Sequence, residues 1–228
     1  LHGQSKHMGI YHALQKLAEQ GEDVPQFGGP WFNSTMQEDL ICVNITRAAA
    51  NAADRAQLTQ AECRMREDAY KLVALLRKLY PEFAKASIAE IAAQGGVRET
   101  YHIRGLYTLS GADILGGAPC ADGVAFCSHP VDIHSAQDNT QTAQYFDTPC
   151  PVPYRVMVAA GFDNLIAAGR CVSCVDEAYA SMRVQGTCMA IGEAAGVAAA
   201  MRRETGCAVT AVNTDDLRAR LQKQGAIV

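Results

Sequence analysis

The chain has 228 residues, of which 49% are hydrophobic and 19% charged, enough apolar content for the core of one large domain or two small ones. Its formal net charge is −4 and its acidic and basic residues are mixed along the sequence, so it lacks the basic stripe that would predict nucleic acid as a partner. The apolar run 194–201 is too short to span a membrane, and the first residues lack the basic-then-apolar profile of a signal peptide, so we expect a cytoplasmic protein with no membrane partner.

The first predicted elements are a helix and a strand separated by a loop. Apolar residues at spacings of three and four predict a helix over residues 5–20, which Gly21 can end. In the stretch GGPWFNSTMQEDL that follows, we expect no long regular element. Residues 39–46 (DLICVNIT) then alternate apolar with smaller or polar residues, as a half-buried strand does.

The middle of the chain mixes helical and extended patterns. Thr59 to Glu62 has the form of a capping box, and apolar residues continue at helical spacing until Pro81, which predicts one long helix. Strand formers interrupted by glycine follow at 96–109, then one helical turn at 110–115 and a strand that runs into a proline turn at 123–134. The sequence therefore predicts a mixed α/β fold.

The last third reads as short strands followed by a long helix. Residues 155–159 and 164–168 have the composition of strands, and the second is fully apolar over 165–168, as in a sheet covered on both faces. Gly169 lets the chain turn at the carboxyl end of that strand, where ligands bind in open α/β sheets. From about Thr187 the chain is predicted to be helical, and its N-terminus offers unpaired N–H groups that suit an anion.

One face of this final helix carries only small residues. Gly192, Ala195, Gly196 and Ala199 recur at spacings of three and four, so another backbone or a flat ligand can approach closely. The same pattern also serves plain packing of a helix against a sheet, and the sequence leaves both readings open.

Three ordered motifs carry a resemblance to a known family. NLIAAGRCVS at 164–173, followed by SMRVQGTCMAIGEAAGVAAA at 181–200, resembles the C-terminal FAD-binding signature of the FAD-dependent oxidoreductases of the glutathione-reductase structural superfamily, in the branch related to fumarate-reductase-like flavoproteins. GVRETYHIRGLYTL at 96–109 and HPVDIH at 129–134 resemble internal motifs of that branch. The resemblance implies FAD as cofactor and hydride exchange with a small organic substrate.

The resemblance also implies which residues meet the cofactor. Residues that match the glycine turn approach the ribityl chain and the pyrophosphate, and residues that match the start of the last helix face the pyrimidine edge of the flavin. The expected cofactor-binding residues are Gly169, Arg170, Ser181, Arg183, Val184, Gly186 and Thr187.

The residues that contact the substrate are expected to come from the two internal motifs. By analogy with the family's substrate domain, Arg98, His102, Arg104 and His134 are candidate catalytic residues, and Asp132 is a further candidate for substrate binding or proton transfer. The alternative for the first of these is that Arg98 and Glu99 form a structural ion pair.

The family's dinucleotide-binding fingerprint, G-x-G-x-x-G between a strand and a helix, is not found in the sequence. We therefore expect the C-terminal portion of a flavoenzyme: residues 1–150 as a substrate-cap region, 151–205 as the C-terminal segment of the FAD-binding domain and 206–228 as a tail helix. The alternative is a non-catalytic chain that needs a partner with the missing domain. Either reading predicts association, as a homo-oligomer or with an N-terminal FAD-binding half.

The nine cysteines are irregularly spaced, unlike a disulfide framework, and most are expected to be free thiols. Cys171 and Cys174 have CxxC spacing, which allows a redox pair or half of a zinc site, but no second ligand pair is evident. Cys127, His129 and His134 could form a metal cluster, yet they surround a proline turn. We expect no metal, and two ordinary thiols beside the cofactor.

Overall fold

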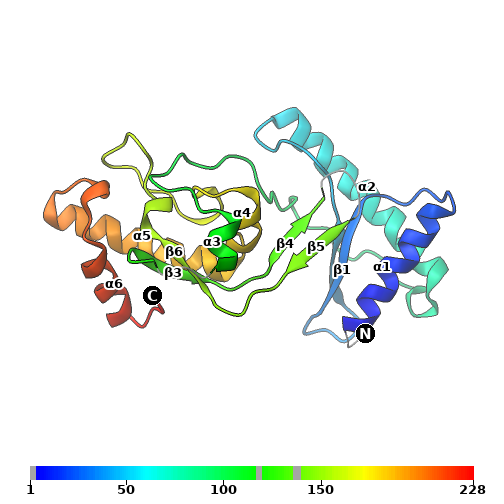
Figure 1. The fold of residues 1–228 in the computed structure, drawn as a ribbon. Helices are drawn as coiled ribbons and strands as arrows, with labels where there is room; N and C mark the ends of the chain where they lie inside the picture. Colours follow the sequence, from blue (N-terminus) through cyan, green and yellow to red (C-terminus); the bar gives the residue numbers. More distant parts are fainter. Residues whose placement is uncertain (1–3, 117–119, 136–139) are drawn as a thin grey trace. The chain divides into compact units, whose positions relative to one another are not determined.

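The computed structural model describes residues 4–116, 120–135 and 140–228, and their helices and small antiparallel sheets form the mixed α/β fold that the sequence predicts (Figure 1). The chain divides into two compact units. Unit 1 contains the described residues up to Val97 together with His134, Ser135 and Thr140, and unit 2 contains the described residues of 98–133 and 141–228. The assignment of residues 1–150 to a substrate cap stays a prediction.

Unit 1 is built from two helices and a two-stranded antiparallel sheet. Its elements are α1 (Gln4–Glu19), β1 (Phe27–Ser34), β2 (Ile41–Thr46), α2 (Arg55–Leu79) and a 3-10 helix (Pro81–Phe83). Helix α1 packs on β1 and α2 packs on β2. The core they enclose contains Ile10, Leu14, Phe27, Leu72 and Leu76, each at most 3% exposed.

Two details of unit 1 differ from expectation. The stretch at 27–34 is a strand, β1, although it contains Gly28, Gly29 and Pro30, and its pairing with β2 is irregular between Phe27 and Trp31. Helix α2 begins earlier than its supposed capping box.

Asp54 is the actual N-cap of α2. Its side chain accepts hydrogen bonds from the backbone N–H of Ala56 (2.8 Å) and of Gln57 (3.3 Å). Thr59 lies inside the helix, where its hydroxyl donates to the Arg55 carbonyl, so the predicted start was wrong. The predicted end before Pro81 is confirmed, and so is the helix over residues 5–20.

Unit 2 is built from helices packed around a short antiparallel ladder. Its elements are α3 (Gly111–Gly116), β3 (Gly123–Cys127), β4 (Val131–His134, of which His134 counts with unit 1), β5 (Gln141–Gln144), β6 (Cys150–Pro153), α4 (Asp176–Met182), α5 (Gln185–Thr205), α6 (Thr214–Lys223) and three 3-10 helices (Tyr154–Val156, Gly169–Cys171 and Val209–Ala211). Strand β3 pairs with β6, and β4 pairs with β5. Helices α5 and α6 both pack on β3 (Figure 1).

Helix α5 buries one face and exposes another. Ile191, Ala194 and Ala198 are fully buried. The small-residue face predicted from the sequence is open instead: Gly192 and Gly196 are exposed, and a Cβ atom added to either would meet nothing within 4 Å. Packing against β3 therefore does not use these glycines.

The strands predicted around this helix are replaced by extended segments joined by single bridges. Residues 164–168 were expected to form a buried strand, but they carry only the Val158–Ile166 bridge, and Leu165 is 43% exposed. The stretch at 155–159 begins as a 3-10 helix, and 96–109 has isolated bridges at Gly105 and Leu109. These predictions were wrong because no neighbouring strand among the described residues continues the ladder.

Among the residues that the structure describes, none of the helices combines the length and the apolar character needed to cross a membrane.

Two neighbours on α5 should respond oppositely to alanine. Ile191→Ala is expected to lower the free energy of unfolding by about 3 kcal/mol, because it leaves a cavity in the core of unit 2. Gly192→Ala is expected to raise it by about 0.5–1 kcal/mol, because the added methyl group meets nothing and the unfolded chain loses freedom. Urea unfolding measures both, and a loss of stability in Gly192→Ala would mean that a neighbour covers this face.

A buried carboxyl on α2 should make stability depend on pH. Asp68 is 5% exposed, and its desolvation raises its pKa above the ordinary value of 3.8. Arg64, whose Nε lies 3.6 Å from Asp68 Oδ2, lowers this pKa but does not cancel the increase. The folded chain therefore binds the proton more tightly than the unfolded chain, so stability falls as the pH rises through and above 3.8.

Asp68→Asn is thus expected to be more stable than the parent chain at pH 7. The difference should vanish below pH 3.8, where the carboxyl group of Asp68 is protonated in the folded chain. Thermal unfolding between acid and neutral pH measures this. The matched control is Glu82→Gln, which changes an exposed carboxyl group that is not among the charges acting on Asp68 and should leave the stability at pH 7 nearly unchanged. A destabilised Asp68→Asn at pH 7 would show that the ion pair with Arg64 outweighs desolvation.

Candidate functional site

His102 is hydrogen-bonded on both sides of its ring. Its Nδ1 lies 2.8 Å from the Val172 carbonyl oxygen and its Nε2 lies 2.7 Å from Glu99 Oε1. A carbonyl oxygen can only accept, so Nδ1 carries a hydrogen, and a second hydrogen bond joins Nε2 to the Glu99 carboxyl group. Their side chains are 19% and 34% exposed, so a small molecule can reach the pair.

Arg98, His102 and Arg170 come together around one tyrosine. The ring of Tyr179, on α4, lies edge-on to the His102 ring with centroids 5.0 Å apart, and its hydroxyl donates to the Arg98 carbonyl. Arg170 Nη1 lies 3.3 Å from the same carbonyl oxygen. Burial raises the pKa of Tyr179 to about 12, so this hydroxyl keeps its proton at neutral pH.

Glu99 pairs with His102, and the alternative of a structural ion pair between Arg98 and Glu99 stays a prediction. Tyr179 was not anticipated, because helix α4 itself was not predicted. The signal for that helix is present in Asp176 and Glu177, two acidic residues in its first turn, which interact favourably with the helix dipole.

The two cysteines of the CxxC element have different surroundings. Cys174 is buried and its sulfur lies 3.7 Å from His102 Nδ1, whereas Cys171 is exposed. Burial raises the pKa of Cys174 to about 12, so it stays a thiol. Both are free, and within the described ranges no group of three His, Cys, Asp or Glu side chains is placed to hold a metal ion.

A second cluster lies where α4 leads into α5. Arg183 Nη2 donates to Asp132 Oδ2 at 2.7 Å, and the two side chains are only 14% and 21% exposed. The Nε of Arg183 is buried and has no hydrogen-bond acceptor among the described residues. Ser181 is fully buried, and its hydroxyl donates to the His129 carbonyl at 2.5 Å. These contacts fasten the start of α5 to the segment after β3.

The start of α5 and the glycine turn lie side by side. The 3-10 helix Gly169–Cys171 packs against α5. Gly169 has a φ of +80°, which favours glycine, and space around its Cα is open. Val184 is the N-cap of α5 but provides no side-chain hydrogen bond, and the first turn holds no acidic residue; Gly186 is exposed and Thr187 is buried.

Two predicted residues stand apart from these clusters. Arg104 is exposed, and its carbonyl accepts a hydrogen bond from Ala160 N at 2.8 Å. His134 belongs to unit 1, where Arg47 Nη2 lies 2.7 Å from its Nδ1 and the Trp31 ring lies 5.9 Å away. All seven expected cofactor residues thus share unit 2 with Tyr179 and with Arg98, His102, Arg104 and Asp132, whereas His134 counts with unit 1.

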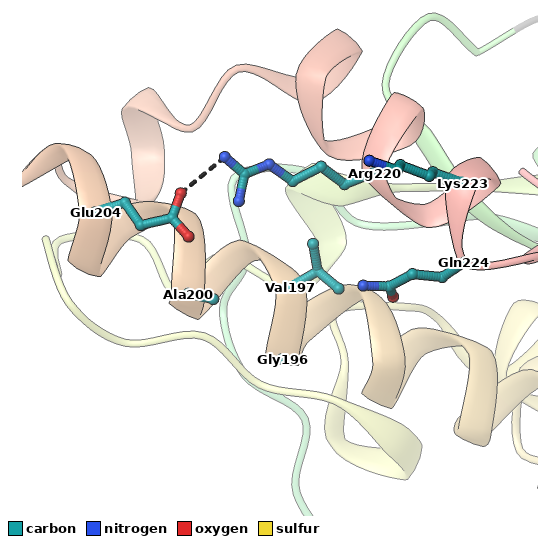
Figure 2. A pocket seen from close by; sticks show the side chains of 7 residues that line it. All are labelled: Gly196, Val197, Ala200, Glu204, Arg220, Lys223 and Gln224. Atoms are coloured by element: carbon teal, nitrogen blue, oxygen red, sulfur yellow. Dashed lines mark hydrogen bonds and ion pairs between the residues drawn. The ribbon is translucent and has the colours of Figure 1, made fainter.

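A cavity of about 530 Å³ lies between α5 and α6, and Figure 2 shows the side chains that line it. Glu204 on α5 and Arg220 on α6 form an ion pair of 2.7 Å along it. None of the predicted site residues lines this cavity, whose lining is Gly196, Val197, Ala200, Glu204, Arg220, Lys223 and Gln224.

The Arg183–Asp132 pair should matter for stability. Asp132→Asn is expected to lower the free energy of unfolding by about 1–3 kcal/mol, because it leaves a largely buried guanidinium without a carboxylate. Urea unfolding at pH 7 measures the loss. Glu204→Gln, which breaks the exposed pair with Arg220, is the matched control and should change little. Equal effects of the two substitutions would contradict the account.

Comparison with known proteins agrees with the resemblance seen in the motifs. The family model described as FAD dependent oxidoreductase matches residues 4–221. Searches of curated proteins and of solved structures give no match. Since the family match spans nearly the whole chain, the protein belongs to the FAD-dependent oxidoreductases and its cofactor is FAD.

Proposed function

We propose that this chain provides the flavin-facing and substrate-facing parts of an enzyme that exchanges a hydride between a small organic substrate and FAD, in the fumarate-reductase-like branch of the family. The observation that carries this proposal is the grouping, within one unit of a family member, of the glycine turn, the start of α5 and the His102–Glu99 pair.

The residues at the start of α5 fit an electron-rich ligand. The buried Nε of Arg183 lacks an acceptor among the described residues, and the first turn of α5 has neither a side-chain cap nor an acid. Gly169 and Gly186 leave open space beside their backbones. Such a site favours negative charge, as on a pyrophosphate or on the pyrimidine edge of a flavin.

Each group of residues then has a distinct task. Gly169, Gly186 and Thr187 would let the cofactor approach backbone N–H groups, and Arg170 and Arg183 would supply positive charge near it. Val184 and the buried Ser181 would fix the direction of the helix start. When bound, FAD supplies an isoalloxazine ring that takes or gives a hydride.

The His102–Glu99 pair would serve the substrate. A hydride transfer to or from a carbon centre is commonly accompanied by proton transfer, and the hydrogen-bonded pair of His102 Nε2 and Glu99 Oε1 would give a proton to a substrate atom or take one from it. The Val172 carbonyl holds the ring at Nδ1, so Nε2 is the atom that moves the proton. Arg98 and Arg104 would bind the charge of an organic anion, and His134 stays a candidate catalytic residue.

The ADP half of FAD needs a dinucleotide-binding unit whose G-x-G-x-x-G fingerprint these 228 residues do not contain. We propose that such a unit, on the same polypeptide or on a partner chain, completes the cofactor site, and that the exposed glycine face of α5 takes part in the association. The alternative is a non-catalytic role in which this chain only supports the partner.

Retention of flavin tests the proposal. After incubation with FAD and removal of the excess, the chain, alone or together with a dinucleotide-binding unit, is expected to keep a flavin absorbance spectrum. Arg170→Gln should raise the dissociation constant of FAD about tenfold, because Arg170 is exposed beside the turn and contributes charge. Arg203→Gln, in the last turn of α5, is the matched control and should leave it unchanged.

Two outcomes would contradict the proposal. If neither the chain alone nor the combined sample retains flavin, the cofactor site is not here. If flavin is retained equally by Arg170→Gln and by the parent chain, FAD binds elsewhere on the protein.

A further inference from the structure

Two buried thiols face each other in the core of unit 2. Cys127 is the last residue of β3 and Cys150 is the first residue of β6, and they are directly opposite partners in the antiparallel ladder. They are 0% and 2% exposed, and both are free. Neither is one of the residues assigned to the cofactor or the substrate.

The ladder places the two sulfurs within bonding reach. Directly opposite residues of an antiparallel pair point to the same face, with Cα atoms about 4.5–5.5 Å apart, which lies inside the range that a disulfide spans. The two thiols are also close enough for each to shift the pKa of the other. A disulfide can therefore form here without moving the strands.

The position of the pair along the chain gives such a bond a consequence. Cys127 is where the chain leaves the β3–β6 ladder, and Cys150 is where it returns. The described residues between them include Asp132, which pairs with Arg183 in unit 2, and His134, which counts with unit 1. A disulfide would close this loop at its base.

We propose that Cys127 and Cys150 are a reversible thiol switch, which forms a cross-strand disulfide when a peroxide oxidises it and so joins the two ends of the segment that carries Asp132 and His134. This inference does not depend on the proposed function. Because both thiols are buried, the oxidant has to be small, and hydrogen peroxide meets that condition.

The chemistry balances with peroxide alone. The Cys127 thiolate attacks one peroxide oxygen, the O–O bond breaks, and the departing hydroxide takes up a proton to give water and a sulfenic acid. The Cys150 sulfur then attacks the Cys127 sulfur, and the S–O bond breaks to release a second water. Two thiols and one peroxide thus give one disulfide and two waters, and a dithiol reductant reverses this by supplying two electrons and two protons.

The order of these steps follows from the interaction between the two thiols. The neighbouring Cys150 side chain lowers the pKa of Cys127, although burial opposes this. The interaction with Cys127, together with burial, raises the pKa of Cys150. Cys127 is therefore the first sulfur to react, and Cys150 is the one that resolves the sulfenic acid.

Peptide mapping of the intact chain tests the proposal. The folded protein is treated with hydrogen peroxide, its remaining thiols are blocked with iodoacetamide under denaturing conditions, and it is digested without reductant. The expected product is a pair of peptides joined through Cys127 and Cys150, which dithiothreitol separates. The oxidised protein should also melt about 5 °C higher or more, because the closed loop restrains the unfolded chain.

Single variants assign the two roles. In Cys150→Ser the joined peptides should be absent, and Cys127 should carry sulfenic or sulfinic acid. Cys171→Ser, which removes an exposed thiol, is the matched control and should keep the joined peptides. The proposal is overturned if peroxide leaves Cys127 and Cys150 of the parent chain alkylatable while exposed cysteines are oxidised, or if either one is joined to a different cysteine.

Discussion

The candidate site depends on the packing of α5 against β3. The buried side chains of α5 include Ile191 and two alanines, Ala194 and Ala198, and this small bulk lets the helix backbone approach the strand closely. The same packing sets the start of α5 against the turn at Gly169–Cys171, since that turn also contacts the helix. One buried helix face therefore positions both parts of the expected flavin site.

The junction before α5 is held by polar contacts rather than by further apolar burial. Arg183 reaches Asp132, and Ser181 reaches the His129 carbonyl, so the helix start is tied to the segment that follows β3. A largely buried ion pair contributes little net stability by itself, but it fixes geometry, because every other arrangement leaves a charge without a partner. This constraint suits a helix terminus that must face a ligand in one orientation.

The sequence predicts the elements whose signals are local. Helical spacing locates α1 and α5, and Pro81 locates the end of α2, because these patterns depend on neighbours along the chain. The same local signals could not show that 155–159 and 164–168 fail to form regular strands, because a strand needs partners that the local sequence does not reveal.

The site residues divide in the same way, into those that a local motif indicates and those that depend on contacts between distant segments. Motif resemblance indicates Arg98, His102 and Arg170, but the partner of Glu99 and the role of Tyr179 depend on how distant segments meet, as does the register that sets Cys127 opposite Cys150.

The most direct test of the central claim is amide hydrogen exchange of residues 183–190 with and without FAD. The account predicts slower exchange there when FAD is bound, alone or with a dinucleotide-binding unit, and no change in α6. Bound flavin with unchanged exchange at residues 183–190 would contradict it.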